Sequence, residues 1–245
     1  MEIPKIIHYC WFGNNEKPTH IKRCIQSWRL YMPDYKIIEW NEKNYDCYKN
    51  EYMLNAYQQK KWAFVTDYVR FDVLYNYGGI YLDTDVELLQ SIPEDIMLNT
   101  PFTCMEPSGK ISPGLIFACE KHNNISKLML DIYNKERFLD NNGKPICKTV
   151  NNYLTELLVK YGYIEKNETQ TVKGLTIYSS DYFCSYDLDV MEPKISLNSV
   201  SIHHYLGTWR KKSLKNYLQK IIKVTFGVQL YRKCINFIRK LKKHI

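Results

Sequence analysis

The sequence lacks several features that would assign it to a class at once. Its eight cysteines include no CxxC pair, and no stretch approaches the ~18 consecutive apolar residues of a membrane-spanning helix. It has no internal repeat, no low-complexity linker and no signal-peptide pattern at its start. With 245 residues, of which 45% are hydrophobic and 24% charged, the chain can bury a sizeable core, which excludes disordered, collagen-like and coiled-coil classes. We therefore expect a cytosolic globular protein with reduced, mostly buried thiols.

Acidic residues are missing from the last part of the chain. Residues 210–245 contain twelve Lys and Arg and no Asp or Glu, so residues 1–209 keep 34 − 12 = 22 basic against 26 acidic residues, a net charge of −4. A mildly acidic body argues against a nucleic-acid partner, which requires basic residues spread over a docking face. We therefore predict a domain over 1–209 and a separate basic tail over 210–245.

The tail has the pattern of amphipathic helices. Apolar residues recur at helical spacing between lysines and arginines: Leu214, Tyr217, Leu218, Ile221 and Ile222, and then Leu230, Cys234, Phe237, Ile238 and Leu241. Such helices are suited to an anionic membrane surface. The alternative is a helical hairpin that packs on the body with its charged face in solvent. We favour membrane-surface association, because the absence of acid exceeds what solubility requires.

The body alternates strand and helix patterns. We predict strands over 5–11, 36–40, 80–82, 115–118 and 176–178, and helices over 18–30, 62–77, 125–133 and 150–161. Gly78 and Gly79 mark the end of the 62–77 helix. This order predicts an α/β fold with a mostly parallel, Rossmann-like sheet, whose ligands bind at the carboxyl ends of the strands.

Two carboxylates follow one of these predicted strands directly. Asp83 and Asp85 are two residues apart, so in extended chain both side chains point to one face. They repel each other unless a cation joins them, and a divalent ion completed by phosphate oxygens is a common way to bind a nucleotide diphosphate. The ordinary alternative is an acidic pair on a solvated loop.

Other candidate ligand residues surround this motif. Asp67 and Arg70 share one face of the preceding helix, where they could meet sugar hydroxyls and phosphate; the alternative is an intrahelical ion pair worth about 0.3 kcal/mol. Trp11 follows the first strand and could stack on a nucleobase for roughly 1–3 kcal/mol, or fill the core. His203 and His204 are adjacent, so at most one reaches a metal if they lie in a strand; a buried hydrogen-bonded pair is the rival interpretation.

Taken together, four segments of the chain resemble a known family. Residues 3–13, 63–71, 74–85 and 203–209 are similar to the DXD region of family 32 glycosyltransferases, which include yeast outer-chain mannosyltransferases and bacterial capsular-polysaccharide enzymes. Clostridial glucosylating toxins share the same core pattern. The resemblance implies a GT-A fold, a nucleotide-sugar donor with a UDP-sugar favoured over a GDP-sugar, Mn²⁺ or Mg²⁺, and retention of anomeric configuration.

The resemblance also implies roles for individual residues. Trp11 would stack on the base, Asp67 and Arg70 would hold the donor sugar, and Asp83 and Asp85 would hold the metal and the diphosphate. His204 would be a further metal ligand, ahead of His203, and Trp209 would contact the leaving phosphate. The predicted catalytic residues are thus Asp67, Arg70, Asp85 and Trp209. Pro113-Gly114 departs from the Asn-Gly or Asn-Ala of relatives near the acceptor side.

Together with the residues above, the resemblance implies a metal-dependent retaining hexosyltransferase of bacterial surface-polysaccharide synthesis. Its acceptor would be a glycan or a lipid-linked oligosaccharide at the inner face of the cytoplasmic membrane. Retention could proceed by front-side attack or through a covalent intermediate on a carboxylate such as Glu106 or Asp181. Two other functions remain open: a host-directed effector that glycosylates protein, and a non-catalytic scaffold that binds nucleotide or carbohydrate. The complete set of candidate site residues argues against the scaffold.

Overall fold

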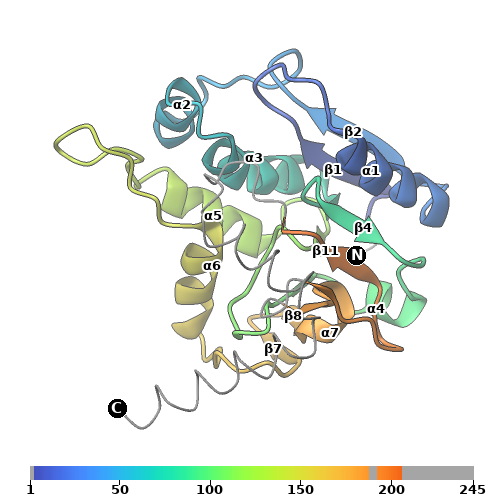
Figure 1. The fold of residues 1–245 in the computed structure, drawn as a ribbon. Helices are drawn as coiled ribbons and strands as arrows, with labels where there is room; N and C mark the ends of the chain where they lie inside the picture. The colour runs from blue at the N-terminus through green and yellow to red at the C-terminus, as the bar shows by residue number, and fades with distance from the viewer. Residues whose placement is uncertain (1–2, 188–191, 206–245) are drawn as a thin grey trace, which may run out of the picture.

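The computed structural model describes residues 3–187 and 192–205. A seven-stranded sheet forms its centre, in the order β2-β1-β3-β6-β5-β8-β7 (Figure 1). The strands are β1 (Ile6–Cys10), β2 (Lys36–Trp40), β3 (Gly79–Tyr81), β5 (Phe102–Cys104), β6 (Phe117–Cys119), β7 (Gln170–Val172) and β8 (Leu175–Tyr178). Trp209 and the 210–245 tail lie outside the described residues, so the predictions made for them remain predictions.

The sheet is mixed but mostly parallel. β1 pairs in parallel with β2 and β3, and β5 pairs in parallel with β8. β6 is antiparallel to both β3 and β5, and β7 is antiparallel to β8. The five strands β1, β2, β3, β5 and β8 therefore run in one direction, which confirms the predicted α/β class with a mostly parallel sheet.

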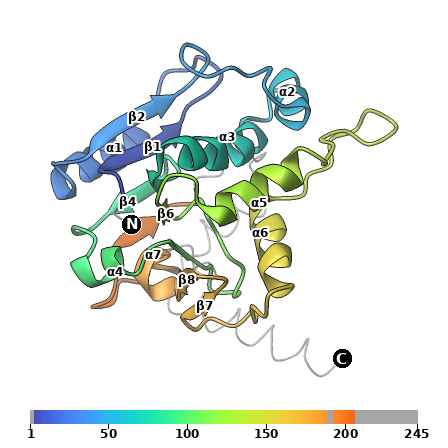
Figure 2. The ribbon, with the colours of Figure 1, turned by 180° about the vertical axis from the view of Figure 1, so that it is seen from behind.

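Helices cover both faces of the sheet. One apolar cluster joins one face to α2 (Glu51–Gln58), α3 (Trp62–Tyr77), α5 (Asn124–Tyr133) and α6 (Val150–Val159). The other joins the opposite face to α1 (Thr19–Tyr31), α4 (Glu94–Leu98) and α7 (Ser180–Phe183). Figure 1 looks onto α1, and Figure 2, from behind, looks onto α3. Neighbouring strand residues alternate between the clusters, as Ile80 and Tyr81 do.

Two small ladders complete the described structure. β4 (Val86–Leu88) pairs antiparallel with β11 (Ser201–His203), and β9 (Tyr186–Asp187) pairs antiparallel with β10 (Glu192–Pro193). The first ladder matters for function, because it brings the end of the body back to the residues that follow β3.

Helix α3 carries two of the predicted site residues and is buried on most of its surface. Its position between the sheet and helices α2 and α5 explains why apolar residues occur on more than one side of it. Gly78 ends it as predicted, with φ +64°, and donates its N–H to the Leu74 carbonyl at 2.8 Å. A Cβ at Gly78 would lie 2.6 Å from the Lys121 nitrogen, so only glycine fits this helix end.

The thiols agree with the expectation of reduced cysteines. All seven cysteines among the described residues are free; six are buried and Cys147 is exposed. Within residues 3–187 and 192–205, every helix is too short or too polar to traverse a bilayer.

His8 on β1 is a fully buried titratable group whose hydrogen bonds fix its neutral form. Its Nε2 donates to the Gly78 carbonyl at 2.8 Å, and Trp40 Nε1 donates to its Nδ1 at 3.1 Å. Burial lowers the pKa of His8 from 6.5 to about 4, against the opposing effect of the Gly78 hydrogen bond. The unfolded chain therefore binds a proton more readily than the folded one between these two values.

We expect His8 to make the protein less stable as the pH falls from 6.5 toward 4. The lowered pKa corresponds to about 3 kcal/mol of unfolding free energy, present above pH 6.5 and lost in this window. Urea unfolding of wild type and His8→Gln at several pH values measures this loss of unfolding free energy. The wild type should lose more stability than the variant on acidification. Parallel pH dependences of the two proteins would contradict the assignment.

Candidate active site

The guanidinium of Arg70 joins two carboxylates at the carboxyl end of β3. Its Nη2 lies 3.3 Å from Asp67 Oδ1 and 3.3 Å from Asp83 Oδ1. Asp67 and Arg70 come from one face of α3, as their spacing predicted, and Asp83 follows β3 by two residues. Arg70 also lies over the ring of Tyr81, with 4.9 Å between the guanidinium carbon and the ring centroid. The pair is therefore part of a larger cluster and not an isolated intrahelical ion pair.

Burial dominates the electrostatics of this cluster. The side chains of Arg70 and Asp67 are 3% and 7% exposed. Burial raises the pKa of Asp67 to about 7, although Arg70 and the backbone N–H of Val150 at the start of α6 favour its charged form. Burial alone would lower the pKa of Arg70, but Asp83, Tyr81 and Asp67 outweigh it and raise that pKa. Arg70 therefore stays a cation at any physiological pH.

One nitrogen of Arg70 has no hydrogen-bond partner in the part of the chain that the structure describes. Nη1 is buried and makes no hydrogen bond to any described residue. An unpaired buried donor costs about 1–3 kcal/mol, and more for a charged group. A bound molecule that supplies an oxygen at this point would remove that cost, which marks the surroundings of Nη1 as a ligand-binding position.

The second carboxylate of the DXD motif is held by a histidine. Asp85 Oδ1 lies 2.9 Å from His203 Nε2, and the Asp85 carbonyl accepts the backbone N–H of His204 at 3.0 Å. Burial alone would lower the pKa of His203, but the charge and hydrogen bond of Asp85 outweigh it and raise that pKa. The pairing follows from the ladder of β4 with β11, which sets His203 opposite Val86.

The ring of His203, and not that of the predicted metal ligand His204, contacts the carboxylate of the second aspartate of the motif. His204 Nε2 lies 2.7 Å from Glu87 Oε2, so its ring faces Glu87, whereas His203 is the histidine that contacts Asp85. The two rings bind different carboxylates, and the expectation that at most one of them reaches a metal stays a prediction. The role of His204 as a metal ligand stays a prediction.

The two aspartates can supply oxygen ligands for a cation, but they do not form a complete cage. Among residues 3–187 and 192–205, no three or more His, Cys, Asp or Glu side chains are grouped as a metal site. Mg²⁺ typically takes one or two carboxylates and completes its shell with water and substrate phosphates. Asp83 and Asp85 therefore fit a hard divalent ion, Mg²⁺ or the similar Mn²⁺, that is bound together with a diphosphate.

Gly114, which precedes β6, touches the first aspartate of the motif. Its carbonyl accepts the Asp83 N–H at 2.8 Å. A Cβ at Gly114 would lie 2.0 Å from Asp83 Oδ2 and 3.1 Å from Arg70 Nη1. Its φ lies outside the left-handed region, so close approach and not backbone conformation requires glycine here. Sequence reasoning marked Gly114 only as a departure from the family pattern.

We expect Gly114→Ala to displace the Asp83 carboxylate and to lower kcat/KM for the donor about tenfold, roughly 1.4 kcal/mol. The thermal unfolding midpoint should change little, because Asp83 is partly exposed and its side chain can turn toward solvent. Asp83→Ala provides the control background, in which Gly114→Ala should cause no further loss. Additive losses in the double variant would show that Gly114 does not act through Asp83.

Trp11 lies directly after β1 and is neither fully buried nor fully exposed. Its Nε1 donates to the Asn15 carbonyl at 2.7 Å, and Lys17 Nζ lies 5.7 Å from its ring centroid. The ring is therefore fixed at the carboxyl edge of the sheet with part of its surface open. The base-stacking role predicted for it stays a prediction.

The two carboxylates considered as nucleophiles differ in their surroundings. Asp181, in α7, accepts hydrogen bonds from Ser179 and Asn198. Glu106 follows β5, and its Oε1 accepts the side-chain amide of Asn151 at 3.0 Å. Asn151 also donates a hydrogen bond to Ser112. Neither Asn151 nor Ser112 was identified as a site residue from the sequence.

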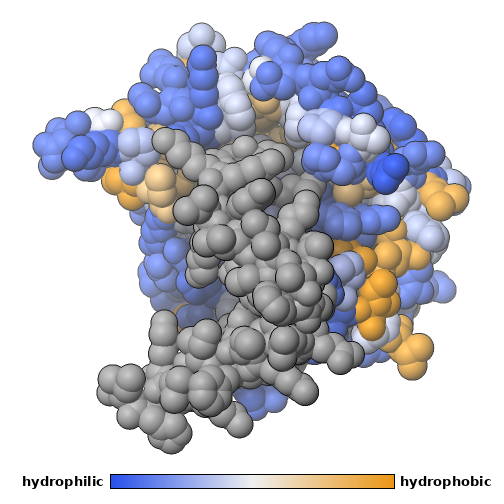
Figure 3. Space-filling view, in the orientation of Figure 1, coloured by the Kyte–Doolittle hydropathy of each residue, from blue (hydrophilic) through white to orange (hydrophobic). Residues whose placement is uncertain are grey.

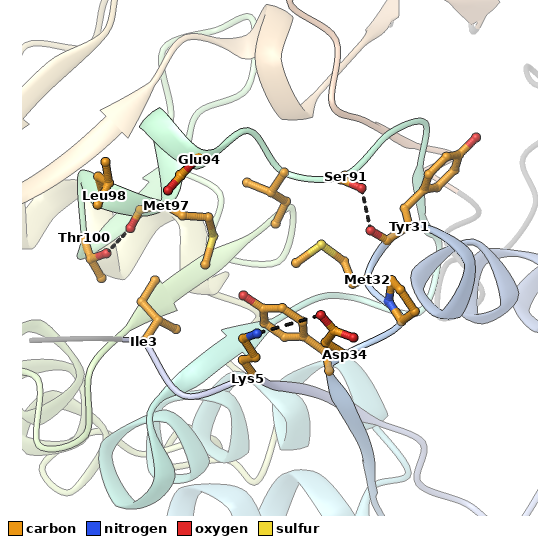
Figure 4. Close-up of a pocket in the computed structure, with 13 residues that line it drawn as sticks. Ile3, Lys5, Tyr31, Met32, Asp34, Ser91, Glu94, Met97, Leu98 and Thr100 are labelled. Atoms are coloured by element: carbon orange, nitrogen blue, oxygen red, sulfur yellow. Dashed lines mark hydrogen bonds and ion pairs between the residues drawn. The ribbon is translucent and has the colours of Figure 1, made fainter.

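A cavity of about 780 Å³ lies at the opposite edge of the sheet. It is lined by residues at the starts of β1 and β2 and around α4, among them Ile3, Met32, Asp34, Met97 and Leu98 (Figure 4). None of the predicted site residues that the structure describes lines it. In Figure 3, hydrophobic surface gathers on the side of the molecule where α4 lies. Because ligands of such sheets bind at the carboxyl ends of the strands, the DXD edge remains the candidate active site.

Part of the chain matches the model of a known protein family. Residues 18–103, about a third of the chain, match the family model described as a glycosyltransferase sugar-binding region containing a DXD motif. This range includes Asp67, Arg70, Asp83 and Asp85. The match confirms the resemblance to DXD glycosyltransferases over these residues.

Two curated relatives of the chain come from yeasts. Mannosyl phosphorylinositol ceramide synthase SUR1 of Saccharomyces cerevisiae is 37% identical over 87 residues, which cover 34% of this chain and 22% of the relative. Inositol phosphoceramide mannosyltransferase 3 of Schizosaccharomyces pombe is 35% identical over 92 residues, which cover 34% and 24%. The match thus spans about a quarter of the length of these relatives. Neither is a bacterial or capsular enzyme.

Two solved structures are similar to the chain at a distance. The PaToxG glycosyltransferase aligns over 64% of this chain and 69% of its own, with 19% identity and a TM-score of 0.47. A glycosyltransferase involved in glycosylation of the major capsid of PBCV-1 aligns over 89% of this chain and 100% of its own, with 13% identity and a TM-score of 0.47.

Proposed function

We propose that the chain is a glycosyltransferase that moves a sugar from a nucleotide-sugar donor to a hydroxylated acceptor. The observation that carries this proposal is the bridge from Arg70 to both Asp67 and Asp83 at the end of β3. One nitrogen of the guanidinium is buried there and has no hydrogen-bond partner within the described part of the chain. A donor would supply the oxygen that Nη1 lacks. The match of residues 18–103 to the DXD region supports this interpretation.

Each residue of the bridge has a distinct task in this proposal. Asp67 is a hydrogen-bond acceptor suited to sugar hydroxyls, and its carboxylate is positioned by Arg70 and by the start of α6. Arg70 faces the leaving diphosphate and offsets the negative charge that grows there, which is the main electrostatic contribution expected in such a transfer. Asp83 and Asp85 would hold Mn²⁺ or Mg²⁺, which when bound neutralises the diphosphate.

We also propose three more specific properties on the basis of the sequence. These are a GT-A fold, retention of anomeric configuration and a UDP-sugar as the favoured donor. The relatives' names, which mention mannosyl transfer and inositol phosphoceramide, add mannose as a donor sugar and a phosphoinositol lipid as an acceptor class. The basic tail would hold the enzyme at the inner face of the cytoplasmic membrane, beside a lipid-linked acceptor. Bacterial surface-polysaccharide synthesis stays the proposed context.

A donor screen tests the proposal. The full chain is incubated with a panel of UDP- and GDP-sugars, GDP-mannose included, with Mn²⁺, with Mg²⁺ and with excess EDTA, and free sugar is quantified. We expect release from at least one donor, and loss of that release in EDTA. A protein that binds nucleotide but hydrolyses no donor would support the scaffold alternative. Release that is unaffected by EDTA would contradict the metal site.

A further inference from the structure

Two parallel strands deliver carboxylates to the same edge of the sheet. Asp83 follows the end of β3 by two residues, and Glu106 follows the end of β5 by two residues. β3 and β5 run in the same direction and are separated by the antiparallel β6, so their ends lie two strand spacings apart, about 10 Å. Asp83 and Glu106 therefore follow strand ends on either side of the segment that leads into β6.

The segment leading into β6 connects these two positions. At one end, the Gly114 carbonyl accepts the Asp83 N–H. At the other, Asn151 Nδ2 donates to Ser112 Oγ at 3.2 Å and to Glu106 Oε1 at 3.0 Å. Asn151 lies in the first turn of α6, whose first N–H binds Asp67. Glu106 is therefore fixed to the same framework that positions the donor-side residues.

Glu106 also lies near the second half of the DXD motif. Its charge acts on both His203 and Tyr205. The rings of those two residues pack edge to face with their centroids 4.1 Å apart, and His203 binds Asp85. Glu106 is thus linked to α6 through Asn151 and lies close enough to the residues beside Asp85 for its charge to act on them.

We propose that Glu106, held by Asn151, binds a hydroxyl group of the acceptor and that the acceptor is a sugar or a cyclic polyol. This proposal rests on the proposed transferase function. A carboxylate accepts hydrogen bonds from neighbouring hydroxyls, and one already held in place loses little entropy on binding. The aromatic ring of Tyr205 adds an apolar surface against which a sugar ring can pack. In this role Glu106 accepts a hydrogen bond and forms no covalent bond, and the Asn151 amide fixes the orientation of its carboxylate.

Partitioning of the donor sugar between water and an added polyol tests this role. The full chain is given a donor that it hydrolyses, together with methyl α-mannoside, methyl β-glucoside, methyl β-galactoside or myo-inositol, and the ratio of new glycoside to free sugar is measured. We expect Glu106→Gln to lower this ratio about tenfold, since a hydrogen bond to a charged group is lost. Asn151→Ala should lower it in the same direction. Glu165→Gln, which changes an exposed glutamate in the same way, should leave the ratio unchanged.

The outcomes are distinguishable. A wild-type protein that hydrolyses the donor but transfers to none of these polyols overturns the proposal. A Glu106→Gln variant that loses hydrolysis and transfer equally also overturns it, because Glu106 would then act in the reaction on the donor. A Glu106→Gln variant with an unchanged ratio of new glycoside to free sugar overturns it as well. If the wild type cleaves no donor at all, the transferase function itself fails.

Discussion

Replacing Asp85 by asparagine is expected to reduce sugar transfer and donor hydrolysis about 100-fold or more while leaving the fold intact. Asparagine keeps the shape of the side chain and its contact with His203, but removes the charge that a divalent cation needs. Initial rates over a range of donor and Mn²⁺ concentrations measure the effect, and thermal unfolding checks the fold.

Asp34→Asn is the matched control for Asp85→Asn. Asp34 is exposed, pairs with Lys5 at 3.8 Å and lies at the opposite edge of the sheet, so its variant should retain wild-type turnover. If Asp85→Asn also retained wild-type turnover at every Mn²⁺ concentration, the DXD carboxylates would not hold a metal.

The second large effect is expected for Arg70→Lys. The guanidinium reaches Asp67 and Asp83 at once and still presents Nη1, whereas a single ammonium cannot occupy all three positions. We expect kcat/KM for the donor to fall about tenfold or more, which corresponds to a loss of about 1.4 kcal/mol of transition-state stabilisation for each factor of ten. Steady-state kinetics with the donor identified by the screen measures this loss.

Arg23→Lys, on the exposed surface of α1, makes the same substitution away from the site and should behave as wild type. An Arg70→Lys loss below about threefold would favour an ion pair without a role in donor binding. Because Arg70 is buried, its variant must also be shown to be folded at the assay temperature.

Local patterns in the sequence predicted the first half of the fold closely. The expected helix over 62–77 matches α3, and the expected strand over 36–40 matches β2. Both carry strong local signals, because an apolar run that ends at two glycines and a short β-branched run between turns each define their own limits. The same holds for the site: i, i+3 spacing was enough to place Asp67 and Arg70 together.

The remaining elements depend on contacts between distant residues. β4 and β5 are three residues each, and β4 is stabilised by pairing with β11 more than a hundred residues later, which no local pattern indicates. The choice of His203 over His204 beside Asp85 follows from the register of that ladder. The links from Asn151 to Glu106 and from Val150 to Asp67 join separate segments in the same way, so they appear only in the folded chain.

Calorimetric titration of a nucleotide diphosphate tests the proposed metal-dependent donor site most directly, because it measures the binding affinity of that site without requiring the acceptor. UDP and GDP are titrated into wild type and Asp83→Asn, each with Mn²⁺ and with EDTA. Wild type should bind one of the two at least about tenfold more tightly with Mn²⁺ than with EDTA, and Asp83→Asn should lose that difference. Equal affinities with and without Mn²⁺ in the wild type, or an undiminished Mn²⁺ effect in Asp83→Asn, would contradict the proposed donor site.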